Sequence, residues 1–119
     1  YLEDKNFKNV EILSETGTVF NEITLYKTGT QHGKREILKP LCEQIGIPYD
    51  AMGIIFKSEN EKTLYVAGDT IYCEEVAAAL NKYAPDIIIV NACGATLLNG
   101  ERIIMKQGDI KEVLNKAPY

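Results

Sequence analysis

Histidine and cysteine are scarce in this sequence. Its 119 residues include one histidine, His32, and three cysteines, Cys42, Cys73 and Cys93, which stand far apart with no CxxC pair. An odd number of widely spaced cysteines argues against a disulfide framework and is typical of a reducing compartment. We therefore expect a cytoplasmic protein.

A basic excess and long apolar runs are also lacking. The formal net charge is −4, whereas a nucleic-acid-binding face needs clustered positive charge. The apolar runs at 54–56 and 87–90 fall well short of the roughly 20 residues that cross a bilayer. The sequence therefore predicts no nucleic-acid partner and no membrane partner. It opens without methionine or a signal-peptide pattern, and we expect it to be an excised piece of a longer protein.

The sequence does contain enough apolar material for one core. Hydrophobic residues make up 45% of the chain and charged residues 25%, which predicts a single folded domain over 1–119. Alternating or apolar segments predict strands at 9–14 and 23–27. A polar turn between 53–57 and 63–67 predicts a hairpin.

Helical periodicity appears in two segments of the chain. Apolar residues recur at helical spacing over 37–45, where Gly46 would end the helix and Pro40 would start or kink it. A second helix is expected over 74–83, with acidic residues in its first turn and Pro85 after its end.

The last third of the chain predicts a strand followed by a helix. Residues 86–90 form a continuous apolar run, typical of a strand that is covered on both faces. Asp109 and Glu112 resemble a capping box that opens a final helix. The expected fold class is therefore α/β (α+β), with a mixed β-sheet covered by helices.

Two loops, 28–33 and 68–70, each follow a predicted strand, where an open sheet presents ligand-binding groups. The first loop carries His32 and the second carries Asp69. Each residue also has a simpler interpretation, His32 as a solvent-exposed loop histidine and Asp69 as a cap of the next helix or a turn residue. The residues alone leave both interpretations open.

Several segments together resemble the later half of the metallo-β-lactamase-superfamily hydrolases. They are TQHG at 30–33, MGIIF at 52–56, TLYVAGDT at 63–70, PDIIIVNA at 85–92 and KAP at 116–118. The similarity points to the lactonase-like group that includes L-ascorbate-6-phosphate lactonase. It extends over nearly the whole chain beyond residue 20.

The resemblance implies that the chain is the C-terminal-side part of a four-layer αββα sandwich with metal ions at one edge of its sheets. By position, His32 becomes a metal ligand, and Asp69 becomes the catalytic carboxylate that bridges two divalent metal ions. Zinc suits imidazole and carboxylate ligands, with manganese or iron as alternatives. Two such ions activate water against an ester, lactone or phosphoester, so a small-molecule substrate is implied.

Parts of the family pattern are missing. The His-x-His-x-Asp-His motif that normally precedes this region is absent, and the closing histidine would fall beyond Tyr119. A catalytic zinc has three protein ligands, and this chain offers His32 and Asp69 alone. We therefore expect this chain by itself to bind no metal tightly and to be inactive. Cys93 stands where relatives carry glycine, and we interpret it as a small buried thiol.

Two other functional hypotheses stay open. The chain could be a non-catalytic α/β binding or assembly module, or a degenerate family member that binds metal without catalysing a reaction. A truncated sandwich would leave apolar faces uncovered, so we also expect a homo-oligomer formed through edge pairing or swapping.

Overall fold

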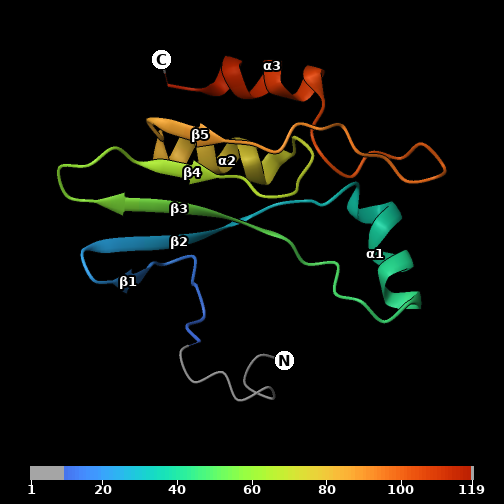
Figure 1. Cartoon of the computed structure of the whole chain (residues 1–119), viewed down its shortest axis with the longest axis horizontal. Helices are drawn as coiled ribbons and strands as arrows, with labels where there is room; N and C mark the ends of the chain where they lie inside the picture. The colour runs from blue at the N-terminus through green and yellow to red at the C-terminus, as the bar shows by residue number, and fades with distance from the viewer. Residues whose placement is uncertain (1–9, 119) are drawn as a thin grey trace.

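The computed structural model describes residues 10–118, which form a five-stranded sheet and three helices (Figure 1). The strands are β1 (Thr18–Phe20), β2 (Ile23–Gly29), β3 (Met52–Ser58), β4 (Leu64–Val66) and β5 (Ile87–Ile89). Their order in the sheet follows the chain, with β1 to β4 antiparallel and β5 parallel to β4. The expected mixed sheet of an α+β fold is therefore confirmed.

The helices are α1 (Arg35–Gln44), α2 (Glu74–Tyr83) and α3 (Gln107–Lys116). Because β5 runs parallel to β4, the chain must cross over the sheet between them, and α2 makes that crossover. It ends where Ala84 takes a left-handed conformation with φ 41°, immediately before Pro85. The predicted hairpin and the predicted second helix are both present.

One face of the sheet packs against α2, and α3 packs in turn against α2. The buried core side chains include Ile55 and Tyr65 from the sheet, Val76 and Leu80 from α2, and Val113 from α3. In β2, Tyr26 lies on the same face because it pairs with Ile55, which pairs in turn with Tyr65. These contacts form the core.

The opposite face of the sheet, here called the open face, is apolar and has no helix against it among the described residues. Strand register places one row of side chains across β2 to β5 on this face, namely Leu25, Phe56, Leu64 and Ile87. The next row consists of Lys27, Ile54, Val66 and Ile89. Ile87 is 44% exposed and Ile89 is 52% exposed, so the prediction that β5 is covered on both faces is wrong for this chain.

The molecule is correspondingly thin. Its principal extents are 46 × 43 × 20 Å. A helix with its side chains is about 10 Å across, so the shortest dimension fits one sheet and one layer of helices. The observed architecture is therefore two layers.

Three local predictions differ from the structure. The strand expected over 9–14 is not formed over 10–14, residue 9 lies outside the described residues, and the first strand is β1 instead. Helix α1 begins before Pro40 and continues through it. The sequence predicted that Asp109 opens the final helix in a capping box with Glu112. In the structure, Asp109 is instead the third residue of α3, where its carboxylate accepts a hydrogen bond from the Lys106 backbone N–H at 2.9 Å.

Over residues 10–118, we find no helix that combines the length and the apolar character needed to span a membrane.

Candidate functional site

Three strand ends meet at one edge of the sheet, here called the carboxyl edge. Strands β2 and β4 flank β3 and are both antiparallel to it, so they run in the same direction, and β5 runs parallel to β4. Their carboxyl ends therefore lie together, and the segments 30–33, 67–70 and 90–91 follow them (Figure 1). This is the usual place for an open sheet to carry a functional site.

Asp69 leaves β4 through a turn at Gly68. Gly68 has φ +71°, and a Cβ atom built on it would lie 2.8 Å from the Met52 carbonyl oxygen. Asp69 is exposed and lines a cleft of about 350 Å³ between the ends of β4 and β5, together with Val66, Gly68, Ile89, Val90 and Asn91. The Asn91 side-chain amide donates a hydrogen bond to Asp69 Oδ1 at 2.7 Å.

The interpretation of Asp69 as a helix cap is wrong. Helix α2 begins at Glu74, and the residue at its N-cap position is Cys73. Asp69 lies four residues before that position, and its carboxylate accepts its hydrogen bond from Asn91 on the neighbouring strand end. The orientation of the Asp69 side chain is therefore set by Asn91, just beyond β5, and not by the following helix.

His32 occupies the loop between β2 and α1. Its ring is half-buried, and Nδ1 is buried without a hydrogen-bond partner among residues 10–118. The following residue, Gly33, has φ +83° and no room for a Cβ atom, which would come within 2.6 Å of a Leu38 methyl and 2.9 Å of the Arg102 carbonyl oxygen. The Tyr49 hydroxyl donates to the Gly33 carbonyl at 2.8 Å. The surface-histidine interpretation therefore fits poorly, since one ring nitrogen is enclosed.

The loops that carry His32 and Asp69 are joined through their neighbouring residues. The Gln31 backbone N–H donates to Thr70 Oγ1 at 3.0 Å, and the Ile71 N–H donates to the Gln31 carbonyl at 2.8 Å. Thr70 is fully buried. The residue before His32 is thus bonded directly to the residues that follow Asp69.

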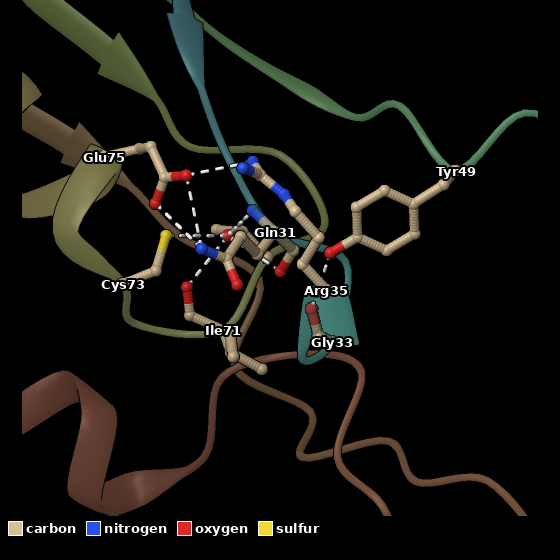
Figure 2. A network of polar contacts seen from close by, with 8 residues as sticks. Gln31, Gly33, Arg35, Tyr49, Ile71, Cys73 and Glu75 are labelled. Atoms are coloured by element: carbon tan, nitrogen blue, oxygen red, sulfur yellow. Dashed lines mark hydrogen bonds and ion pairs between the residues drawn. The ribbon is translucent and has the colours of Figure 1, made fainter. Parts of the chain in front are cut away.

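A polar network continues from this junction to the starts of α1 and α2 (Figure 2). The Gln31 amide nitrogen donates to both carboxylate oxygens of Glu75, at 3.2 and 3.0 Å. Arg35 also donates to Glu75 at 3.0 Å. Glu75 therefore connects the loop of Gln31 to the starts of both helices.

The pKa values of Glu75 and Cys73 are both shifted at this junction. Partial burial acts to raise the pKa of Glu75, but hydrogen bonds from its own backbone, Cys73 and Gln31, with the charge of Arg35, outweigh burial and lower it. Burial raises the pKa of the Cys73 thiol, and the adjacent Glu75 carboxylate raises it further. Cys73 is therefore held as a thiol and Glu75 as a carboxylate.

Sequence reasoning missed the partners of the two predicted residues. Gln31, Thr70 and Asn91 all lie in the segments that carry the family resemblance, but no local pattern assigned them a role. The signal available for Asn91 was its place immediately beyond an apolar strand. The interpretation of Cys93 as buried is also wrong, because this residue is exposed.

The chemistry of His32 and Asp69 fits a divalent metal. A buried imidazole nitrogen without a partner and an exposed carboxylate are both suitable ligands for zinc, manganese or iron. Within residues 10–118, however, no group of three or more histidine, cysteine, aspartate or glutamate side chains is placed to hold a metal ion. Among the described residues, His32 and Asp69 are therefore candidate ligands that do not form a complete metal site by themselves.

Comparison with known proteins points to hydrolases. The chain matches no protein-family model. Over 113 residues, 95% of this chain, it is 39% identical to the UPF0173 protein YddR of Bacillus subtilis (strain 168). These residues cover 42% of that relative, so the chain spans less than half the length of the curated protein that it matches.

Two solved structures share the fold over 98% of this chain. A possible metal-dependent hydrolase from Veillonella parvula DSM 2008 superimposes with a TM-score of 0.86 at 36% identity, and 44% of that chain is covered. An isothiocyanate hydrolase from Delia radicum gut bacteria superimposes with a TM-score of 0.82 at 31% identity, and 45% of it is covered. The expected relationship to hydrolases is confirmed at this level, whereas the lactonase-like branch stays a prediction. The chain is similar over nearly its whole length, and over less than half of theirs, to proteins named as hydrolases.

Proposed function

We propose that this chain is the C-terminal-side part of a metal-dependent hydrolase of the metallo-β-lactamase superfamily, and that residues 1–119 form one domain of it. The observation that carries the proposal is the convergence of three strand ends at the carboxyl edge. There Asp69 is exposed in a cleft and the His32 loop is bonded to its turn. Similarity to a possible metal-dependent hydrolase supports it.

His32 and Asp69 would hold divalent metal, most simply zinc, at this edge. Bound metal would supply a water of lowered pKa and would polarise the bond to be cleaved. The chain's own contribution is to orient the ligands. Thr70 and Gln31 fix the two loops relative to each other, and Asn91 restrains the Asp69 carboxylate. The remaining ligands would come from the part of the protein outside this chain.

The substrate is proposed to be a small molecule with an electrophilic centre that water can attack. Esters, lactones and phosphoesters are the classes expected from the family resemblance. One structural relative is named as an isothiocyanate hydrolase. Isothiocyanates, whose central N=C=S carbon is electrophilic, are therefore a further substrate class to consider. We propose that the pocket walls that select among these substrate classes lie partly outside this chain, and that this chain is inactive alone.

The compartment proposed for this protein is the cytoplasm. The side chains of Cys42, Cys73 and Cys93 are all free thiols. Free thiols, one of them exposed, persist most readily under reducing conditions.

The proposal is tested by metal content and hydrolysis in the full-length protein that contains this chain. We expect about two metal ions per chain, as in dinuclear hydrolases. We expect Asp69→Ala to lose metal and to lower kcat/KM by more than about 100-fold, because losing a ligand should exceed the 10- to 100-fold cost of losing a ligand's supporting contact. The assay panel should contain an ester, a lactone, a phosphoester and an isothiocyanate.

Asp50→Ala is the matched control, because Asp50 is an exposed aspartate in the loop that precedes β3. It should leave metal content and rate unchanged. If the full-length protein binds no metal and hydrolyses nothing in the panel, the hydrolase proposal is wrong and the non-catalytic module becomes the better account. If Asp69→Ala keeps its metal and its rate, Asp69 is not a ligand.

A further inference from the structure

The contact between Asn91 and Asp69 is set by the sheet. Val66 pairs with Ile89 in the parallel ladder, and the Ala67 N–H continues that ladder by donating to the Ile89 carbonyl at 2.9 Å. The two polar residues then follow within three positions of this pair, at the same edge of the sheet. Their side chains meet at 2.7 Å across the cleft that both of them line.

The chemistry of this contact suits the support of a metal ligand. A carboxylate has two oxygens with several lone pairs, so a bond from Asn91 Nδ2 to Oδ1 leaves Oδ2 and further lone pairs for a metal. The amide is neutral, so it fixes the orientation of the carboxylate without cancelling its charge. A lysine or arginine in the same place would compete with a bound cation.

Stability does not explain the contact well. Asp69 and Asn91 are both exposed, and a hydrogen bond between exposed side chains adds little to folding because water replaces it when it is lost. The bond instead restricts the rotation of a carboxylate at the mouth of a cleft. Hydrogen bonds of this kind to metal-binding carboxylates orient the ligand and raise metal affinity.

We propose that Asn91 is a positioning residue that orients the Asp69 carboxylate for metal binding. This inference rests on the proposed function, because it requires Asp69 to be a ligand. It assigns to the end of β5 a role that acts through Asp69 rather than directly on the metal.

The test is calorimetric titration of the metal-free full-length protein with Zn²⁺, carried to millimolar concentrations so that weak binding stays measurable. Asn91→Leu removes the donor and keeps the branching at Cγ and the number of non-hydrogen side-chain atoms. We expect it to weaken Zn²⁺ binding by about 10- to 100-fold. The unfolding temperature of the metal-free protein should stay the same. Asn81→Leu on the exposed surface of α2 is the matched control and should change neither quantity.

A double-mutant cycle separates positioning from direct ligation. In the Asp69→Ala background, Asn91→Leu should weaken binding no further, since the residue that it orients is gone. An equal loss in both backgrounds would show that Asn91 acts independently of Asp69, and it would overturn the proposal. Asn91→Ala serves as the second donor-free variant if the leucine variant fails to fold.

The remaining outcomes distinguish this inference from the proposed function. If Asp69→Ala loses Zn²⁺ while both Asn91 variants bind it as tightly as the unsubstituted protein, Asn91 has no positioning role and the hydrolase proposal stands. If Asp69→Ala itself binds Zn²⁺ normally, Asp69 is not a ligand, and the positioning role of Asn91 is overturned together with that part of the proposed function.

Discussion

At the scale of single residues, one glycine determines how Asp69 leaves its strand. Gly68 has φ +71°, a backbone conformation that is strained for residues with a side chain. The Met52 carbonyl oxygen lies close to the position that a Cβ atom of this residue would occupy. The Gly-Asp-Thr sequence marks the position, but the close approach comes from β3, the neighbouring strand. The turn and the candidate ligand therefore depend on the same backbone contact.

We expect Gly68→Ala to lower the free energy of unfolding by about 1 to 3 kcal/mol, the usual cost of a non-glycine residue in this conformation. Urea denaturation of the full-length protein measures the effect. Metal affinity should fall as well, because the shifted turn displaces Asp69.

Gly108→Ala provides the control for this substitution. Gly108 lies within α3, and a Cβ atom there would meet nothing within 4 Å. Alanine in a helix is favoured over glycine by about 0.5 to 1 kcal/mol, so this variant should be slightly more stable. Equal effects of the two substitutions would contradict the strain argument.

At the scale of elements, Glu75 connects the starts of two helices to the loop before His32. It lies in the first turn of α2, accepts hydrogen bonds from Gln31 and pairs with Arg35 at the start of α1. Its lowered pKa means that the folded state favours the carboxylate more than the unfolded state does. Glu75 therefore stabilises the fold when it is ionised.

The sign of the pH dependence follows from that shift. The stabilisation by Glu75 is complete above its ordinary pKa of 4.5 and is lost as the pH falls through the lower pKa of the folded state. We expect Glu75→Gln to lower the free energy of unfolding at pH 7 by up to about 1 kcal/mol, a surface-pair value because both partners are partly exposed. Below pH 4 the difference should shrink.

Denaturation curves between pH 3 and 7 measure this effect. Glu74→Gln is the matched control, since Glu74 is the exposed neighbour in the same helical turn. A difference between wild type and Glu75→Gln that is constant across this pH range would mean that the Glu75 charge plays no part.

Elements with strong local periodicity were predictable from the sequence. The hairpin of β3 and β4 and the helix α2 carry clear apolar patterns and short polar turns. Strand β1 has three residues and forms by pairing with β2, so its own sequence gives little signal. Helix α1 contains a proline that local rules place at a start or a kink, yet it continues on both sides.

The candidate site was predictable only in part. His32 and Asp69 stood out because their loops follow strands and resemble a known family. Their partners depend on which strands run in the same direction, and pairing between segments distant in the sequence decides that. Asn91 and Asp69 are 22 residues apart, and local pattern alone does not bring them together.

At the scale of the whole molecule, the open face is the feature that needs a partner. Its two apolar rows cross four strands, and Lys27 is the one charged residue in them. β5 is also an edge strand, with unpaired backbone groups on its outer side among the described residues. Large apolar faces and free strand edges both promote association.

The related proteins are more than twice as long as this chain. We propose that the remaining part of the full-length protein covers the open face and that a second copy covers it when the 119-residue chain is alone. Ile87 is well placed to test this, since it lies on both the open face and the edge strand β5. A charge there would oppose face packing and edge pairing alike.

We expect the 119-residue chain to sediment as a dimer or larger species at about 100 μM, within the concentration range where exposed apolar faces associate. Ile87→Lys should shift it to monomer. Leu98→Lys is the matched control, because Leu98 is fully exposed in the loop beyond β5 and off the sheet, and it should leave the association unchanged.

In the full-length protein the same Ile87→Lys substitution should lower stability, because it places a charge where the face is covered. A 119-residue chain that is monomeric at this concentration would contradict self-association. A full-length protein that tolerates Ile87→Lys would mean that the open face stays uncovered there too.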